Sequence, residues 1–588
     1  KEDVLKVFQN PNNVIVGHYF IPYDAPALEK MFGFEIKATI IDTIGISWYL
    51  YDERKKHGLE DYGLEMGVEK IEVKDEEWKT LSYDKAVERC ETDVKINVNI
   101  WVKFLRYLRK IYDNDNATII RLITYLNEKL KCLRDQERFK VRIGQDKVQE
   151  SFDFFLPMKE EKFNILKSVM PKIPNKVKRT KPKNCYKKDG ELSKAGEKWF
   201  YLLDKASLDE DYEGEIEEIV SWDEPNPNSP EQIKNWLYSL KWKPITFEAR
   251  KNTKGEINEI PQVNLKGGKL CESVKRLIKK EPAVEELEGL GIIKHRLGLL
   301  KSLKECSEET GYVVAGAHAL TSSLRLKHVR PIANLPKYSG KKDISDGYWI
   351  RGCIIAPDGY EICGSDMSGL EDRVKQHFIF DYDPEYVKTM MSEDFDPHLD
   401  LAVTAKALTE EQAQAHKDGK EDYKETRHKY KTGNYSCQFG AGGAKIAKTL
   451  DIPVKEGKQI HTTYWKRNWA VKAVAKDSYY KTVNNKMWLF NPISKFYYPL
   501  RNEKDIFSSL CQAGGVYIFD MWLYFMREQN IIPVLQYHDE KMSYNLESQR
   551  DTIREILKKS VKKVNKILQL KRDMDVDVQF GHTYAEVH

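Results

Sequence analysis

The sequence predicts a multidomain protein that combines α/β and α+β folds, on three observations. The chain has 588 residues and a mass of 68.7 kDa, which corresponds to about four modules at roughly 150 residues per domain. Residues 14–20 form a short apolar run and a helical pattern begins at residue 25, as in a buried strand that feeds a helix. Residues 350–370 and 531–546 alternate apolar and turn residues in the manner of antiparallel hairpins. A small binding module is therefore excluded.

Composition narrows the class of protein further. Hydrophobic residues make up 41% and charged residues 32%, and no stretch approaches the roughly 18 apolar residues that span a bilayer. The N-terminus lacks the form of a signal peptide, so we expect a cytoplasmic protein with no membrane contact. The nine cysteines are scattered and form no C-x-x-C pair, which argues against a disulfide framework or a zinc ribbon.

The remaining elements follow from periodicity and turn signals. Apolar residues recur at helical spacing from residue 93 to about 137, and a polar turn at 112–118 divides this stretch into two helices. Residues 170–230 are rich in Pro, Lys, Asp and Gly, so we expect a long surface insertion, and Ser229 then begins a helix.

In the second half of the chain, two strands joined at residues 357–359 are expected within 350–370, with Asp366 at the end of the second strand. Residues 399–500 are expected to be helical with glycine interruptions. The hairpin predicted at 531–546 carries His538, Asp539 and Glu540 near its turn, and an amphipathic helix opens the last 40 residues.

Basic charge is concentrated in one stretch. The net charge is only +5, but Lys172 to Lys188 holds eight basic residues and no acidic one. Two interpretations stay open, a solvated loop and a contact with a polyanion.

Two carboxylates and one helical face point to phosphoryl chemistry. Asp366 and Asp539 each stand where a strand ends or turns, and such a pair could hold two divalent ions. Arg427, Lys431 and Tyr435 are spaced four residues apart, so they share one face of a helix. Two cations and an aromatic ring on such a face suit a triphosphate and its base or sugar.

The order of these motifs resembles motifs A, B and C of the family-A DNA polymerases. The sequences that carry the resemblance are DMSGLEDR from Asp366, R-x3-K-x3-Y with a following F-G from Arg427, and HDE from His538. Arg501 and Gln512 stand where that family has primer–template contacts, Asp396-Pro397-His398 resembles its D-x-H motif, and the chain ends in His588 as many members do. Segments 187–199 and 226–244 are similar to the phage replicative branch, which implies replication of viral DNA in the cytoplasm of an infected host.

The resemblance implies a right-hand polymerase with thumb, palm and fingers and a role for each motif residue. Asp366 and Asp539 would bind two Mg²⁺ ions, with Glu540 and His538 as supporting groups at the primer end. Arg427 and Lys431 would hold the triphosphate, Tyr435 would stack on the sugar and base, and Glu371 would crowd the nucleotide 2′-position. The expected partners are primer–template DNA and dNTPs, bound by a monomer, with a processivity factor at the insertion as a further candidate.

One motif departs from the family pattern. The family's T-x-T-G-R reads here as residues 321–325, with Leu324 in the glycine position and Arg325 as the expected DNA contact. Two other functions remain as alternatives. A single-subunit RNA polymerase is disfavoured by Glu371, and a catalytically dead scaffold is disfavoured because both metal carboxylates, Arg427 and Lys431 are present.

The first segment resembles the DnaQ-like 3′–5′ exonucleases, which have an RNase H-like fold. Residues 17–28 are similar to the second motif of that family, with Asp24 as its carboxylate, and residues 89–94 are similar to the third, with Asp93. Two further metal ions would bind there if the site were complete. Only 23 residues precede Asp24 and none supplies the first D-x-E motif, and Arg89 replaces a common tyrosine, so we expect an impaired nuclease.

The resemblance also gives the expected domain boundaries: an N-terminally incomplete exonuclease domain at 1–112, a thumb at 113–310 with a basic insertion near 170–228, the first part of the palm at 311–400, fingers at 401–500, and the second part of the palm at 501–588.

Overall fold

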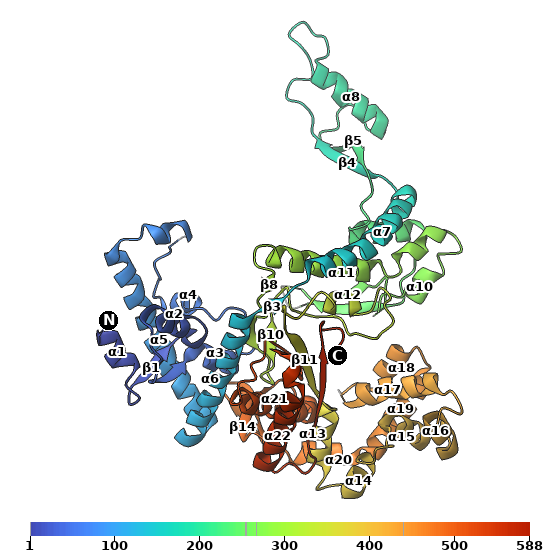
Figure 1. The fold of residues 1–588 in the computed structure, drawn as a ribbon. Helices are drawn as coiled ribbons and strands as arrows, with labels where there is room; N and C mark the ends of the chain where they lie inside the picture. The colour runs from blue at the N-terminus through green and yellow to red at the C-terminus, as the bar shows by residue number, and fades with distance from the viewer. Residues whose placement is uncertain (1, 74, 253–255, 266, 439, 588) are drawn as a thin grey trace. The chain divides into compact units, whose positions relative to one another are not determined.

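The computed structural model describes residues 2–73, 75–252, 256–265, 267–438 and 440–587 (Figure 1). The chain divides into two compact units. The first unit comprises residues 1–144, 306–335 and 351–588, and the second comprises residues 145–305 and 336–350. Phe439 and His588, which belong to motifs predicted from the sequence, lie outside the described residues.

The first unit begins with a strand–helix pattern, as predicted. Strand β1 (Val14–Gly17) leads through a π-helical turn (Phe20–Asp24) into α2 (Ala25–Phe32), and β2 (Thr39–Asp42) pairs with β1 in parallel. The other helices of this segment are α1 (Glu2–Phe8), α3 (Thr43–Leu50), α4 (Leu59–Met66), α5 (Tyr83–Ile111) and α6 (Asn116–Phe139). The predicted pair of long helices is confirmed as α5 and α6. Asp115, in the polar turn between them, caps α6 through its carboxylate.

A four-stranded antiparallel sheet lies at the centre of the first unit. Its strands are β15 (Leu535–Tyr537), β16 (Glu540–Asn545), β11 (Glu361–Met367) and β17 (Val576–Gly581), in that spatial order. The hairpin predicted at 531–546 is confirmed as β15 and β16. The hairpin predicted at 350–370 is wrong, because Ile354 and Ile355 form only isolated bridges and β11 pairs on both edges with strands from the C-terminal part.

Helices surround this sheet, and the prediction of a purely helical segment at 399–500 is wrong in its last part. Residues 480–500 form a three-stranded antiparallel sheet, β12 (Tyr480–Val483), β13 (Lys486–Asn491) and β14 (Phe496–Leu500). Alternating aromatic residues favour strands here, and Trp488, Phe496 and Tyr498 are fully buried. The helices of this half are α13 (Leu370–Ile379), α14 (Pro384–Met390), α15 (Pro397–Thr404), α16 (Glu410–Lys417), α17 (Lys424–Gln438), α18 (Gly443–Leu450), α19 (Val454–Arg467), α20 (Trp469–Asp477), α21 (Ile506–Arg527) and α22 (Arg550–Leu568). The predicted amphipathic helix near the C-terminus is confirmed as α22.

The N-terminal segment shares one hydrophobic core with the later helices of the first unit. Ile44, Phe104 and Leu126 belong to the same cluster as Trp488 and Trp522. The Tyr49 hydroxyl donates to the backbone carbonyl of Tyr497 at 2.7 Å. The small strands that complete this unit are β3 (Val141–Arg142), β8 (Tyr312–Val313), β9 (Ala317–Leu320) and β10 (Leu326–His328).

The second unit is built on α7 (Gln145–Val169) and α11 (Leu290–Ser307) and carries the predicted insertion. The insertion is folded and is not a loop: β4 (Ile173–Arg179) pairs with β5 (Ile216–Asp223), and α8 (Lys194–Ala206) packs Trp199 into a small core of its own. Ser229 caps α9 (Pro230–Ser239) as predicted. The remaining elements are β6 (Phe247–Lys251), β7 (Ile257–Pro261), α10 (Glu272–Lys275), a 3-10 helix (Pro282–Leu287) and the start of α12 (Tyr348–Arg351).

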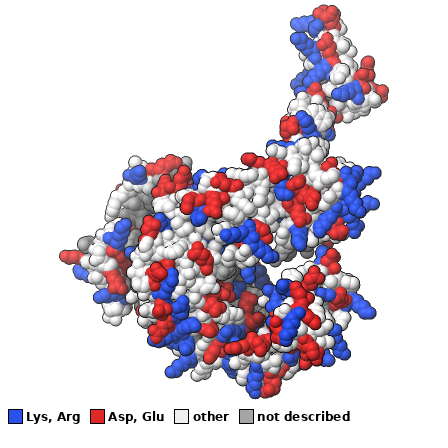
Figure 2. Space-filling model, turned by 45° about the vertical axis from the view of Figure 1, so that its right-hand side comes forward, with Lys and Arg blue, Asp and Glu red and all other residues white. Residues whose placement is uncertain are grey.

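The basic charges of the insertion are matched by acidic ones. Lys176, Lys178 and Arg179 in β4 form ion pairs with Glu217, Glu215 and Glu218. The interpretation of the basic run as a solvated loop is wrong for residues 173–179, which form β4. The contact with a polyanion stays a prediction. In the space-filling view, blue and red side chains are intermixed over this segment (Figure 2). No helix in the described ranges is both long and apolar enough to cross a bilayer.

Candidate active site

The sheet register brings the two predicted metal carboxylates together. In β11, Asp366 lies opposite Glu540 of β16 and Asp577 of β17. The backbone N–H of Met367 donates to the backbone carbonyl of Asp539 at 3.2 Å, which fixes the turn between β15 and β16 beside the end of β11. The structure therefore places Asp366 and Asp539 at one end of this sheet, where the inner strand β11 ends beside the β15–β16 turn; we call this end the carboxylate edge.

Electrostatics at this edge favour a bound cation. Burial raises the pKa of Asp366 to about 7, and the neighbouring charges of Asp539, Glu540 and Asp577 add to this shift. Burial also raises the pKa of Asp539. Clustered carboxylates with raised pKa values repel one another, and a divalent cation would relieve that repulsion.

The donor set fits Mg²⁺ with substrate as a partner. Within the described ranges, no three His, Cys, Asp or Glu side chains are arranged as a ready set of metal ligands. Mg²⁺ is commonly held by one or two carboxylates together with water and substrate phosphates. Asp366 and Asp539 therefore suffice as protein ligands for such an ion.

The negative charge of Glu540 lies close to the positive charge of Arg351. Its carboxylate lies 3.6 Å from the Arg351 guanidinium, and each side chain is no more than 5% exposed. The Arg351 guanidinium also lies 4.5 Å from the ring centroid of Tyr584. No local pattern marks Arg351, because its partner is 189 residues away and the contact depends on the sheet.

The turn at residues 321–325 keeps its shape with Leu324 in place of glycine. Leu324 has φ 68°, in the left-handed region that favours glycine. The Thr321 hydroxyl accepts from the backbone N–H of Arg325 at 3.0 Å, and Leu324 is fully buried. Packing of a buried leucine offsets the backbone strain, which is about 1 kcal/mol for such a residue.

Arg325 faces the first turn of α13. Its guanidinium donates to the Glu371 carboxylate at 3.1 Å. A cavity of about 330 Å³ opens beside this pair. Its lining residues are Arg325, Gly369, Leu370, Glu371, Asp372, Tyr435, His538 and Asp539. The structure thus brings Glu371, Tyr435, His538 and Asp539, which belong to three separate predicted motifs, around one cavity.

The cationic face of α17 is confirmed as a helical face and has an acidic partner. Arg427 Nε donates to the Asp396 carboxylate at 2.6 Å, while the other Asp396 oxygen accepts from the backbone N–H groups of His398 and Leu399. The rings of His398 and Tyr435 lie 5.5 Å apart. Asp396 therefore caps α15 and orients Arg427 at the same time.

Arg501 and Gln512 are not gathered into this cavity. Arg501 is exposed and lies 3.2 Å from Glu53, an ion pair in which both side chains are more than 65% exposed. Gln512 is half-buried in the second turn of α21. Both residues stay candidates for DNA contact, which the structure does not test.

The structure places the two N-terminal acids in different settings. Asp24 ends the π-helical turn before α2, and burial raises its pKa. Asp93 lies in α5 and forms an ion pair with Lys70 at 2.8 Å. Within the described parts of the chain no hydrogen bond or ion pair joins Asp24 to Asp93. Arg89 lies with its guanidinium 5.0 Å from the Trp78 ring centroid and donates to the backbone carbonyl of Ile71.

A third N-terminal acid was missed because its role is structural. Asp42 is fully buried and accepts from the backbone N–H groups of Tyr19, Ile21 and Ile44. Burial raises its pKa to about 6 in spite of these hydrogen bonds. Asp42 thereby fixes the turn that carries Asp24 to the end of β2.

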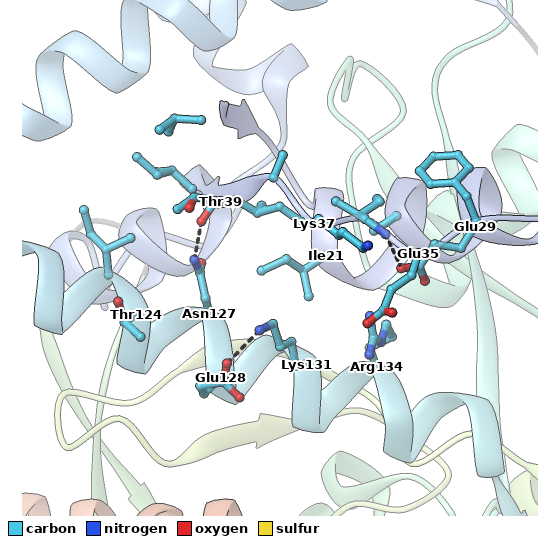
Figure 3. A pocket seen from close by; sticks show the side chains of 18 of the residues that line it. Ile21, Glu29, Glu35, Lys37, Thr39, Thr124, Asn127, Glu128, Lys131 and Arg134 are labelled. Atoms are coloured by element: carbon cyan, nitrogen blue, oxygen red, sulfur yellow. Dashed lines mark hydrogen bonds and ion pairs between the residues drawn. The ribbon is translucent and has the colours of Figure 1, made fainter. Parts of the chain in front are cut away.

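A larger cavity of about 1130 Å³ lies between β2, the end of α2 and α6 (Figure 3). Its polar lining includes Lys131, which pairs with Glu128 at 2.7 Å, and Asn127, which donates to the backbone carbonyl of Ile40 at 2.6 Å. None of the site residues predicted from the sequence lines it.

Two residues of the carboxylate edge were missed by sequence reasoning. Asp577 lies opposite Asp366, and Asp372 lines the cavity beside Tyr435. The alternation of acidic and apolar residues at 573–578 was a signal for a strand with one acidic face, so Asp577 could have been found. Asp372 stands inside a motif, but only the structure shows that its side chain faces the cavity.

The clustered carboxylates beside this cavity suit phosphoryl chemistry with a divalent cation, and comparison with known proteins identifies the family. The sequence profile described as DNA polymerase family A matches residues 205–586, which is more than half of the chain. The chain belongs to DNA polymerase family A.

Individual relatives agree at lower coverage. The chain is 32% identical over 154 residues to DNA polymerase I of Helicobacter pylori, and the match spans 26% of this chain but only 15% of that relative. The POL domain of Pol1 from M. smegmatis, solved in complex with DNA primer–template and dNTP, shares the fold. That likeness has a TM-score of 0.67 at 14% identity and covers 99% of this chain and 88% of the other.

Proposed function

We propose that this chain is a DNA-directed DNA polymerase that extends a primer with dNTPs under the direction of a template. The observation that carries the proposal is the position of Asp366 and Asp539 at the carboxylate edge, beside a cavity that also holds Glu371 and Tyr435. Membership of family A supports the same activity.

The side chains at the site would mainly position the nucleotide and neutralise its charge. Arg427 and Lys431 on α17 would hold triphosphate oxygens, with Arg427 oriented through its Nε by Asp396. Two Mg²⁺ ions bound at Asp366 and Asp539 would activate the primer 3′-hydroxyl and neutralise the charge of the leaving pyrophosphate. Arg351 would hold Glu540 in place opposite Asp366.

Discrimination against ribonucleotides is assigned to Glu371. Arg325 holds the Glu371 carboxylate in place. The 2′-hydroxyl of a ribonucleotide would therefore clash with Glu371 and would gain little binding free energy from it. A single-subunit RNA polymerase is the alternative, and comparison of dNTP with rNTP incorporation distinguishes the two.

The finer assignments form part of the proposal. The segments keep the predicted thumb, palm and fingers boundaries, and residues 1–112 are a DnaQ-like exonuclease domain with weak activity. Its weakness is supported by the ion pair that occupies Asp93. Replication of a phage genome in the host cytoplasm rests on the resemblance of segments 187–199 and 226–244 to the phage branch. A processivity factor at the β4–β5 insertion would meet a surface of mixed charge.

Magnesium-dependent primer extension tests the proposal. Asp366→Asn and Asp539→Asn should each abolish extension and leave primer–template binding nearly unchanged, because each removes a metal ligand and no DNA contact. Asp381→Asn is a matched control, since this exposed carboxylate lies outside the site and pairs with Lys571. Extension by either site variant at more than a few per cent of the parent rate would refute the metal assignment.

A further inference from the structure

Asp372 is a carboxylate in the nucleotide cavity that no contact in the protein explains. It follows Glu371 in the first turn of α13 and lines the cavity of about 330 Å³ together with Tyr435. Within the described parts of the chain Asp372 makes no hydrogen bond and no ion pair. A half-buried carboxylate without a hydrogen-bond donor costs free energy unless a ligand supplies one.

Lys375 provides the nearby countercharge. It lies one helical turn after Asp372, so the two side chains share a face of α13. Lys375 is only 3% exposed, and its ammonium donates to the Asn468 side chain at 2.7 Å. Its positive charge favours the ionised form of Asp372, which burial disfavours. The Asp372 carboxylate is therefore held at the cavity by the charge of Lys375, whose own position is fixed by Asn468.

The neighbours of Asp372 decide what donor it can meet. Glu371 accepts from the Arg325 guanidinium at 3.1 Å through one of its oxygens. The Tyr435 hydroxyl makes no hydrogen bond with any described residue. Burial raises the pKa of Tyr435, and the negative charge of Asp372 raises this pKa further. Tyr435 and Asp372 thus face the same space as an unpaired donor and an unpaired acceptor.

We propose that Asp372 is a specificity-determining residue that accepts a hydrogen bond from the 3′-hydroxyl of the incoming nucleotide. When the nucleotide lacks that hydroxyl, Tyr435 donates to the same carboxylate in its place. Lys375 is a positioning residue that holds Asp372 through the face of α13. This inference rests on the proposed polymerase function and adds a residue to its sugar pocket.

A double-mutant experiment tests the assignment. The ratio of kcat/KM for dNTP over ddNTP is measured in the parent, in Tyr435→Phe, in Asp372→Leu/Lys375→Met, and in the combined variant. The Leu/Met pair removes both buried charges together, which cores commonly tolerate. Tyr435→Phe should raise the ratio about tenfold or more in the parent background and leave it unchanged within about twofold in the Leu/Met background.

Further variants guard against trivial results. Asp372→Asn keeps an acceptor oxygen and should retain most of the Tyr435→Phe effect, and Asp372→Ala replaces the Leu/Met pair if that pair does not fold. Asp381→Asn controls for the loss of one negative charge. An equal effect of Tyr435→Phe in both backgrounds would overturn the inference, and so would a change confined to rNTP incorporation. Absence of dNTP extension by the parent chain would instead refute the polymerase function itself.

Discussion

At the residue scale, some charged side chains of the candidate site are held in ion pairs within the protein and others are not. Arg325 holds Glu371, Asp396 holds Arg427, and Arg351 holds Glu540. Among the described residues, Asp366, Asp539 and Asp372 form no ion pair with a cationic side chain, although Lys375 lies one turn from Asp372. Buried charges that are left uncompensated are costly unless a ligand pairs with them. The unpaired carboxylates therefore mark where Mg²⁺ and the nucleotide would bind.

Tyr435 gives a prediction about chain terminators. By its resemblance to family members with tyrosine at this position, the parent chain should incorporate ddNTPs readily, because the Tyr435 hydroxyl replaces the missing 3′-hydroxyl contact. Tyr435→Phe should restore discrimination by about tenfold or more. Competition between ddNTP and dNTP in single-nucleotide extension measures this, and equal discrimination by both proteins would show that the α17 face has been placed in the wrong register.

Asp396 gives a second prediction, on nucleotide affinity. Asp396→Asn keeps the cap of α15 but weakens the hold on Arg427 Nε, so the KM for dNTP should rise about tenfold with kcat little changed. Burial alone would raise the pKa of Asp396, but hydrogen bonds from Leu399 and Arg427 lower it. Because the pKa of Asp396 is lower in the folded protein than in the unfolded chain, the contacts of its carboxylate stabilise the protein at pH values above the ordinary pKa of aspartate. This stabilisation is lost as the pH falls through the folded-state pKa. Steady-state kinetics and the pH dependence of unfolding check both statements, and an unchanged KM would contradict the first.

At the scale of elements, local signals were sufficient where a strand or helix is stabilised by its own neighbours. The hairpin of β15 and β16, the helices α5 and α6, and the caps at Ser229 and Asp115 were readable from spacing and turn residues. Strand pairing over long separations was not. β11 takes both its partners from residues 540–581, and the strands at 480–500 form because buried aromatic residues pack against α21, which no local window contains.

The same limit applies to the site. Motif order identified Asp366, Asp539, Glu371 and Tyr435, because each is marked by its immediate sequence. Arg351 and Asp577 contribute through the sheet register, and Asp372 through the direction of its side chain, so they became visible only in three dimensions.

The folded insertion leads to a prediction about processivity. Residues 173–223 form a hairpin and a helix with their own small core, so they can be replaced by a short linker without exposing the remainder of the unit. This deletion should shorten the product made per binding event and leave single-nucleotide addition unchanged. Primer extension with a trap for free enzyme measures both. A matched variant, Lys176→Ala/Lys178→Ala, should change product length little, because exposed ion pairs of this kind contribute only about 0–1 kcal/mol each. Unchanged product length after the deletion would show that the insertion serves no partner or DNA.

At the scale of the whole chain, residues 1–144 are part of the first unit and share its core with residues 470–526. The Tyr125 hydroxyl donates to Asp520 across this core, and Lys129 pairs with the same carboxylate at 2.6 Å. The N-terminal segment therefore stabilises the rest of the unit through this shared core, whether or not it hydrolyses DNA.

The last prediction concerns that nuclease. DnaQ-like hydrolysis requires metal ions held by several carboxylates, but Asp93 is paired with Lys70, Asp42 is buried under three backbone donors, and Arg89 is directed towards Trp78. We expect this chain to remove 3′-nucleotides from single-stranded DNA slowly or not at all, while Asp24→Ala/Asp93→Ala keeps primer extension and thermal stability close to those of the parent. A labelled single strand with Mg²⁺ measures excision, beside Lys70→Met, which frees the Asp93 carboxylate and should not lower any residual excision. Robust excision by the parent that the double variant loses would show that Lys70 yields to the metal and that the site is competent.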